Sequence, residues 1–294
     1  MTPAREINWR RRLVLAAPWL WLALFFLAPF ALVAKISLAQ VQLSVPPYTP
    51  LIDAAGHTQA TLANYKLLFS DSLYVRAYWG AIRIAAIATL LALLIGYPFA
   101  YAIARAPASR RSFYLLLAMA PFWTSFLVRI YAWMGLLRPG GLVNATLMDL
   151  GVIDAPLKLM NTEGAVIFGI VYAYLPFMVL PLYARLEKLD PALLEAAADL
   201  GATPWRAFRA ITWPWSRPGV WAGCLLVFIP ALGEFVVPEL LGGPDTLMIG
   251  KVMWSEFFTN RDWPMSAAAT VVLLVLLVAP IVAFQALARR SEAA

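Results

Sequence analysis

Long apolar stretches separated by shorter polar connections are the dominant pattern of this chain. A helix that crosses a bilayer needs about 20 apolar residues. The stretches that reach this length predict membrane helices at about 13–36, 79–104, 113–137, 162–186, 218–241 and 264–288. Prolines inside these stretches indicate kinks rather than ends, because neighbouring helices can satisfy the carbonyls that a proline leaves free. The pattern therefore predicts an all-α integral membrane protein with six transmembrane helices.

The first stretch also needs to be distinguished from a signal peptide, since Arg10, Arg11 and Arg12 precede it. It is too long for the apolar region of such a peptide, and no small-residue cleavage site closes it. We therefore expect a retained membrane helix.

Composition agrees with a membrane location and removes several other classes. Hydrophobic residues make up 62% of the chain and charged residues only 13%, against roughly 25% charged in a soluble domain. The net charge of +7 does not indicate a nucleic-acid partner, because the basic residues form short clusters between apolar runs. One cysteine and one histidine exclude disulfide frameworks, Cys/His metal sites and Cys/His nucleophile pairs.

The distribution of Lys and Arg predicts the orientation. Fourteen of the 23 lie at the two chain ends and in the second and fourth connections, and nine lie elsewhere. Because cytoplasmic connections carry the excess of basic residues, we expect both termini and the fourth connection to be cytoplasmic. The predicted divisions are a cytoplasmic N-terminus at 1–12, the first helix at 13–36, an external loop at 37–76, a permease core at 77–286 with a cytoplasmic loop at 187–217, and a cytoplasmic C-terminus at 287–294.

The external loop 37–76 is long and rich in turn formers. Pro46, Pro47, Pro50 and Gly56 lie in its first half, and such residues punctuate regular structure. We expect this loop to form a small external cap.

The cytoplasmic loop 187–217 carries the signals of a helix, a bend and a second helix. Asp190-Pro191 is a helix cap followed by proline at the first helical position. Gly201 supplies the left-handed residue that ends this helix. Thr203 and Pro204 repeat the same cap, and Pro214 is expected to end the second helix.

The same loop matches a known motif: Glu-Ala-Ala, three residues, Gly, nine residues, Ile, two residues, Pro. This pattern resembles the signature of permeases of ABC importers. The resemblance implies the type I ABC importer permease fold and a loop that fits a cleft on an ATPase carried by another polypeptide. Trp205 and Phe208 are large side chains of the kind that dominate interface energy. The predicted coupling residues are Glu195, Ala196, Ala197, Gly201, Trp205, Phe208, Ile211 and Pro214.

An amphipathic helix lying on the bilayer is the alternative interpretation of this loop. The complete match to the motif favours coupling. The chain itself has no nucleotide site, since Gly250-Lys251 is followed by Val252 rather than Ser or Thr. We therefore expect no enzymatic activity and no cofactor in this chain, with ATP and Mg²⁺ bound by the partner ATPase.

Two further segments resemble the permeases of spermidine/putrescine importers. They run from Gly233-Glu234-Phe235 to Gly242-Gly243-Pro244, and from Arg261 to Pro264. The resemblance covers essentially the whole chain and is closer to the first of the two permeases in such systems. It implies a second homologous permease, an ATPase dimer and a periplasmic polyamine-binding protein as partners, in the bacterial inner membrane and in contact with its lipid. Permeases for iron, sulfate and other solutes share the coupling motif.

A polyamine site needs carboxylates for the ammonium groups and aromatic faces for cation–π contacts. The predicted substrate-path residues are Glu234, Glu239, Glu256, Trp254, Tyr97, Trp123 and Tyr172. An intramembrane carboxylate is either paired or part of a path, so Glu234 can instead neutralise Arg83 or Arg129. Glu239 and Glu256 can instead contact a delivery protein or pair with Lys251 and Arg261. The aromatic residues can instead serve packing.

The predicted function is a permease subunit that imports polyamines, putrescine or spermidine, by alternating access. Its alternatives are an ABC permease for another small solute and an ATP-independent secondary transporter. A membrane enzyme is disfavoured because no His, Cys or carboxylate group has catalytic spacing.

Overall fold

The structure is a computed structural model that describes residues 9–52 and 56–292. Regular secondary structure in these ranges is helical, apart from the isolated β-bridges Val41–Tyr48 and Ile52–Thr58. This confirms the predicted all-α class. The chain divides into two compact units, one formed by the residues up to Val75 together with those from Met253 onward, and one formed by Arg76–Val252.

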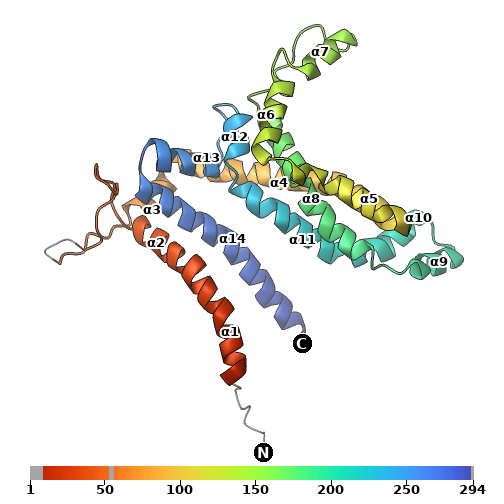
Figure 1. The fold of residues 1–294 in the computed structure, drawn as a ribbon, viewed down its shortest axis with the longest axis horizontal. Coiled ribbons are helices and arrows are strands. Elements are labelled where there is room, and N and C mark those ends of the chain that lie inside the picture. Colours follow the sequence, from red (N-terminus) through yellow and green to blue (C-terminus); the bar gives the residue numbers. More distant parts are fainter. Residues whose placement is uncertain (1–8, 53–55, 293–294) are drawn as a thin grey trace, which may run out of the picture. The chain divides into compact units, whose positions relative to one another are not determined.

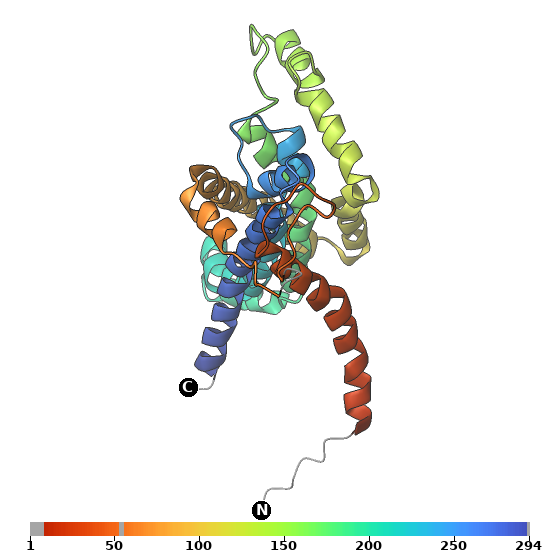
Figure 2. The ribbon, with the colours of Figure 1, turned by 90° about the vertical axis from the view of Figure 1, so that its left-hand side faces the viewer.

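The first unit is a helix pair with a folded connection at one end. α14 packs along α2 and α3, while α1 and the C-terminal part of α14 lie at the other end of the unit (Figure 1, Figure 2). Its elements are α1 (Trp9–Leu22), the π-helical turn η1 (Ala23–Leu27), α2 (Ala28–Ser37), α3 (Ala63–Ser70), the start of α4 (Ser72–Arg105), the π-helical turn η4 (Ser255–Thr259) and α14 (Trp263–Glu292).

The second unit is built around α8 and α11, which pack on each other along their length. Its other elements surround this pair or connect to it. They are the rest of α4, α5 (Ala108–Met119), the 3-10 turn η2 (Ala120–Trp123), α6 (Phe126–Leu137), α7 (Leu142–Asp149), α8 (Glu163–Leu186), α9 (Pro191–Asp199), α10 (Pro204–Ala207), the π-helical turn η3 (Phe208–Thr212), α11 (Trp213–Leu232), α12 (Val236–Leu240) and α13 (Ile249–Trp254).

Glycines let the central helices of this unit approach closely. Met178 on α8 is fully buried, and a Cβ at Gly223 on α11 would lie 2.7 Å from its sulfur. A Cβ at Gly96 on α4 would lie 2.9 Å from Met178 Cγ. Small residues at helix crossings are typical of membrane bundles, where backbone proximity replaces the hydrophobic driving force.

The described residues contain four helices long and apolar enough to cross a membrane, or five if one bent pair counts as a single span. The four are Val14–Ser37, Ser72–Arg105, Glu163–Leu186 and Pro204–Leu232, at the first, second, fourth and fifth predicted positions. The apolar part Trp263–Val278 of α14 is shorter. It corresponds to the start of the predicted helix at 264–288.

The third predicted helix, 113–137, is broken rather than continuous. Ala108–Trp123 and Phe126–Asp149 meet at 85°. Pro121 lies in the turn η2, and Thr124 and Ser125 are extended between the two helices. The Thr124 hydroxyl donates to Pro121 O at 2.9 Å. The side chain thus supplies a hydrogen bond where the helix ladder stops.

The fifth predicted helix, 218–241, has the wrong bounds. The helix begins at Pro204 and ends at Leu232, so Pro214 does not end a helix as expected. The π-helical turn η3 precedes Pro214, and Trp213 N–H reaches back to Phe208 O. A widened turn of this kind accommodates a residue that cannot continue the normal ladder.

The described part of the connection 37–76 folds back onto the end of α2. The Asn64 amide donates to Ser37 O at 3.0 Å and to Ala39 O at 2.8 Å. The Ser37 and Tyr65 hydroxyls are 2.7 Å apart. These bonds tie α3 to the end of α2 and fix the base of the turn between Val41 and Tyr48.

Candidate functional site

The loop 187–217, hereafter the Glu195 loop, has the predicted helix–bend–helix form. The Asp190 carboxylate accepts Ala192 N–H at 3.0 Å and caps α9. Gly201 has φ +78°, and Ala202 N–H donates to Ala197 O at 2.9 Å. This is the hydrogen-bond pattern of a left-handed helix end. Thr203 then caps α10 by accepting Arg206 N–H at 3.4 Å.

Apolar side chains are exposed on this loop. Leu200 is 88% exposed and Trp205 is 69% exposed. Glu195, Ala196 and Gly201 are also exposed, and Ala197 is half-buried. Exposed apolar groups beside polar ones are typical of a surface that a partner covers.

Phe208 differs from Trp205 in where its ring lies. Phe208 is half-buried, with its ring centroid 5.4 Å from that of Trp205 and 5.8 Å from that of Tyr97 on α4. Ile211 is half-buried and Pro214 is exposed. The two stacked rings therefore differ in environment. Phe208 packs against Tyr97 of α4, whereas Trp205 is exposed.

Tyr97 belongs to the base of the Glu195 loop. Its hydroxyl is 2.9 Å from Ser216 Oγ, and its ring centroid is 5.8 Å from that of Trp213. Ser216 is fully buried. This placement gives Tyr97 a packing role between α4 and the start of α11.

Glu234 lies at the break between α11 and α12 and is 7% exposed. One carboxylate oxygen accepts the N–H groups of Phe235, Val236 and Val237 at 3.1, 2.9 and 3.4 Å. The other accepts the Tyr174 hydroxyl from α8. Glu234 thus caps the first turn of α12, where a negative charge is also favoured by the helix dipole.

The alternative pairing of Glu234 with an arginine is not what the structure shows. Arg83 forms its ion pair with Glu163 at the start of α8. The Arg129 guanidinium lies 5.8 Å from the Phe126 ring centroid, and its Nε and Nη1 atoms are buried without a hydrogen-bond partner. Glu234 is stabilised by a tyrosine and by backbone instead.

The other predicted path residues lie in several places. In the second unit, Glu239 pairs with Lys251 at 3.3 Å, as one alternative expected. The Tyr172 ring centroid is 5.3 Å from that of Trp133. Trp123 is largely exposed at the break between η2 and α6.

In the first unit, Glu256 accepts the Tyr74 hydroxyl and the Asn260 amide, each at 2.9 Å. Trp254 is partly exposed, and its ring centroid lies 4.1 Å from that of Phe258. Asp262 caps α14 by accepting Met265 N–H at 2.9 Å. Burial raises the pKa of the Asp262 carboxyl, against the lowering effect of that hydrogen bond.

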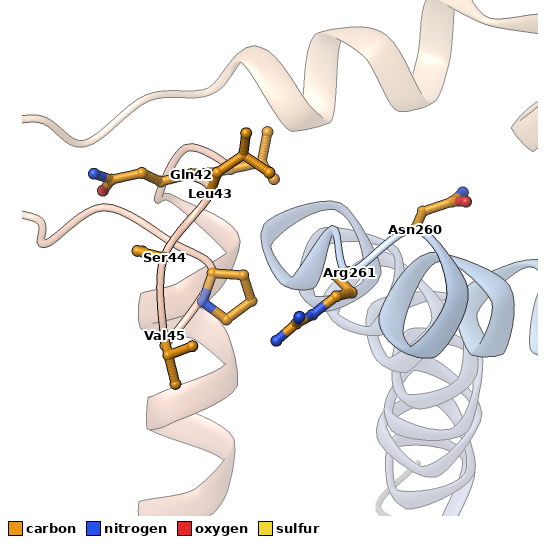
Figure 3. A pocket seen from close by; sticks show the side chains of 8 residues that line it. Gln42, Leu43, Ser44, Val45, Asn260 and Arg261 are labelled. Atoms are coloured by element: carbon orange, nitrogen blue, oxygen red, sulfur yellow. The ribbon is translucent and has the colours of Figure 1, made fainter.

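A second candidate surface in the first unit is the turn 41–47 together with Asn260 and Arg261. These residues line a cavity of about 320 Å³, and Arg261 points toward the part of the turn that carries Ser44 and Val45 (Figure 3). Leu43 is fully exposed and Val45 is 89% exposed. Arg261 has φ +56°, a left-handed conformation uncommon outside glycine.

Comparison with known proteins finds a family that matches the part of the chain containing the Glu195 loop. The family model described as "Binding-protein-dependent transport system inner membrane component" matches residues 88–292. The chain belongs to this family. The match contains the Glu195 loop and both helices that flank it. The family is a transport component of the inner membrane, which implies that the chain is not an enzyme.

Named relatives of the chain are transport permeases. The Haemophilus influenzae spermidine/putrescine transport system permease protein PotB is 42% identical over 267 residues, 91% of this chain and 90% of that protein. The PotB protein of Escherichia coli K12 is 47% identical over 217 residues, 74% of this chain and 78% of PotB. The inner membrane ABC transporter permease protein YdcU of the same organism is 35% identical over 74% of this chain and 73% of YdcU.

Solved structures show the same fold at low sequence identity. A bacterial ABC transporter involved in the import of the acidic polysaccharide alginate is similar with TM-score 0.72 and 17% identity, over 96% of each chain. A bacterial alginate transporter in complex with an alginate pentasaccharide-bound periplasmic protein gives TM-score 0.73 and 17% identity, over 96% of this chain and 95% of that one. These matches establish the ABC importer permease fold for this member of the family.

Sequence patterns did not reveal the partners of the site residues. Tyr174 lies 60 residues before Glu234, and Tyr97 lies 119 residues before Ser216. The tyrosines were visible in the sequence, but nothing in the spacing of these residues indicated which polar group each would meet. The hydrogen bond from Arg185 to Trp215 O, which joins residues 30 positions apart, was missed for the same reason.

Proposed function

We propose that the chain is one permease subunit of an ATP-driven importer of polyamines, with putrescine or spermidine as cargo. The observation that carries this proposal is the 42% identity to a spermidine/putrescine permease over about nine-tenths of both chains. The similar alginate transporters carry a polyanion on the same fold. The fold alone therefore does not select the cargo, and the sequence relationship does.

In this proposal the chain crosses the bacterial inner membrane six times, with both termini and the Glu195 loop in the cytoplasm. The excess of Lys and Arg at the chain ends and in the Glu195 loop supports this orientation. The broken pair α5–α6 counts as one crossing and α14 as the last. A broken helix is tolerated in a membrane where it is buried in protein or lines a cavity.

The proposed partner of the Glu195 loop is an ATPase subunit, present as a dimer that binds ATP and Mg²⁺. Exposure of Leu200 and Trp205 beside the motif residues supports such a contact. A second, homologous permease completes the membrane part. Closure of the ATPases draws the two loops together and opens the permeases outward, and hydrolysis resets them.

The proposed partner of the turn 41–47 and Arg261 is the periplasmic binding protein that delivers the polyamine. The turn lies at the end of the first unit that is away from α1. This end of the unit is external in the proposed orientation. Hydrogen bonds from Gln42 N–H to Pro47 O at 3.3 Å and from the Ser44 hydroxyl to Pro46 O at 2.6 Å hold the turn. A turn held in this way presents Leu43 and Val45 at low entropic cost.

For the path of the cargo, we propose contacts with Glu239, Glu256, Trp254, Trp123 and Tyr172. Carboxylates suit the ammonium groups, and aromatic faces suit both the charges and the methylene spacers. Glu234 contributes by holding the break between α11 and α12, because it is buried and caps the first turn of α12. Tyr97 acts at the base of the Glu195 loop.

The test is uptake by the complete complex. The chain is co-expressed with candidate second-permease, ATPase and binding-protein subunits of the same organism in a strain that lacks polyamine import. Uptake of labelled putrescine and spermidine is then measured. Saturable uptake that excess unlabelled polyamine suppresses, and excess sulfate or ferric iron does not, is the expected result.

The energy source is tested in the same cells. Depletion of ATP should stop uptake, while collapse of the proton gradient at constant ATP should leave it. Uptake with the opposite dependence would contradict an ABC importer. Saturable uptake of another solute with no polyamine uptake would contradict the cargo and retain the transporter class.

A further inference from the structure

Arg185 and Trp215 are joined across the base of the Glu195 loop by two hydrogen bonds in opposite directions. Arg185 Nε–H donates to Trp215 O at 3.1 Å, and Trp215 Nε1–H donates to Arg185 O at 3.0 Å. The guanidinium carbon lies 4.7 Å from the centroid of the Trp215 ring. Arg185 is in the last turn of α8 and Trp215 in the first turn of α11.

The position of this pair suits its chemistry. The last carbonyls of a helix have no partner within the helix, and Leu189 N–H donates to Leu186 O rather than to Arg185 O. The Trp215 indole supplies a donor for Arg185 O. The Arg185 cation is favoured at the carbonyl end of α8 by the helix dipole and is further stabilised by the aromatic face.

The backbones of α8 and α11 are in contact next to this pair. A Cβ at Gly219, one turn after Trp215, would lie 2.9 Å from Pro181 O and 3.0 Å from Arg185 Cβ. Leu186 is buried, and the buried hydroxyl of Ser216 donates to Trp213 O at 2.9 Å. Close-packed helices with paired polar groups resist separation.

The segment between Arg185 and Trp215 contains most of the Glu195 loop, so the pair connects the two ends of that segment. Separation of the end of α8 from the start of α11 would require both hydrogen bonds to break. We infer that Arg185 and Trp215 are positioning residues of transport, which make α8 and α11 respond to the Glu195 loop as one body. This inference rests on the proposed function, because it requires an ATPase that acts on the loop.

Neither residue has to touch the cargo or the ATPase for this role. Its signature is therefore a change in coupling rather than in binding. Loss of the pair should lower the number of polyamines imported per ATP hydrolysed, while the complex still assembles and still hydrolyses ATP. A role limited to stabilising the fold would lower uptake and hydrolysis together and leave their ratio unchanged.

The experiment uses the full complex reconstituted in vesicles, with polyamine import and ATP hydrolysis measured on the same preparation. Trp215→Phe keeps the ring and its volume but removes the Nε1–H donor. Arg185→Met keeps most of the stem and removes the Nε–H donor and the charge. Trp79→Phe makes the same chemical change on an exposed tryptophan of α4 and serves as the control.

We expect both variants at the pair to lower the import-to-hydrolysis ratio at least threefold, and Trp79→Phe to leave it unchanged. The double variant should lower the ratio no more than the stronger single variant, because each substitution already breaks the connection between Arg185 and Trp215. If Arg185→Met does not assemble, Trp215→Phe decides the matter alone, since it leaves the packing volume in place.

A wild-type ratio in Trp215→Phe with an intact complex would overturn the inference. So would a proportional loss of import and hydrolysis. Failure of the wild-type complex to import any polyamine would overturn the proposed function instead, so the two failures are distinct.

Discussion

Tyr174 on α8 donates its hydroxyl hydrogen to the carboxylate of Glu234 at the point where the chain leaves α11. The other oxygen of Glu234 accepts backbone N–H groups at the start of α12. One side chain therefore satisfies the backbone at a helix break and ties that break to a neighbouring helix. Because Glu234 is only 7% exposed, water cannot replace these hydrogen bonds.

Glu234→Ala should destabilise the protein on the order of 2 kcal/mol, because it leaves buried N–H groups without acceptors. Tyr174→Phe removes one hydroxyl and should cost about 1 kcal/mol. Glu234→Gln retains a carbonyl oxygen for the backbone and should be close to Tyr174→Phe in stability. Thermal unfolding of the purified complex in detergent ranks the three variants by stability.

Uptake by the same variants separates structure from cargo contact at this position. We expect Glu234→Gln to import polyamine at most of the wild-type rate. A glutamine variant of nearly normal stability that imports nothing would mean that the negative charge itself acts on the polycation. An alanine variant as stable as wild type would contradict the capping role.

Gly201 is a position where the backbone, rather than space, limits substitution. A Cβ there would meet nothing within 4 Å, but φ is +78°. A β-branched residue in this conformation costs roughly 1–2 kcal/mol or more, whereas Asn adopts it readily. Gly201→Val should abolish uptake by reorienting α9 against α10, and Gly201→Asn should retain most of it.

Membrane insertion is the control for this pair of variants. Both should reach the membrane at wild-type levels, because the exposed loop is outside the helix core. Equal loss of uptake in the Asn and Val variants would show that a side chain at this position blocks a contact, and that backbone conformation is not the cause.

The local chemistry of the Glu195 loop could be predicted from the sequence because each signal acts within a few residues. Asp190, Thr203 and Gly201 fix the backbone next to themselves, and the structure confirms all three. Pro214 was misjudged because its effect depends on the turn before it. A π-helical turn at Phe208–Thr212 lets the helix pass through.

The remainder of the site depends on which helices meet, and this is not encoded locally. Apolar length predicted long apolar helices, four of which the described residues contain. It does not reveal that the predicted helix 113–137 is bent by 85° at Thr124 and Ser125. Charge balance suggested Arg83 or Arg129 for Glu234, yet the packing of α8 on α11 brings Tyr174 there first. Charge complementarity alone therefore identified that Glu234 needs a partner, without identifying the partner.

Trp205 and Phe208 should respond differently to truncation although they are neighbours in one aromatic stack. Trp205 is 69% exposed, so Trp205→Ala should leave thermal stability nearly unchanged and weaken association with the ATPase at least tenfold, as for an interface anchor. Phe208→Ala should instead lower stability on the order of 2 kcal/mol, since its ring packs on Tyr97.

Co-purification with the ATPase and thermal unfolding of the variants measure the two effects. If Trp205→Ala binds the ATPase normally, the exposed ring serves the bilayer surface, as in the alternative interpretation of this loop. If Phe208→Ala keeps its stability but loses the ATPase, the division of the pair into an inner and an outer ring is wrong.

The turn 41–47 should be needed for delivery of cargo and not for the transport cycle itself. Leu43→Asp and Val45→Asp place charges where the structure exposes apolar groups, and their exposure means that folding is little affected. We expect each to reduce the stimulation of ATP hydrolysis by the binding protein several-fold, with basal hydrolysis unchanged.

Leu62→Asp, exposed just before α3 in the same unit, is the matched control and should retain full stimulation. Normal stimulation in both turn variants would place the binding protein elsewhere. Loss of basal hydrolysis as well would show instead that the turn supports the fold.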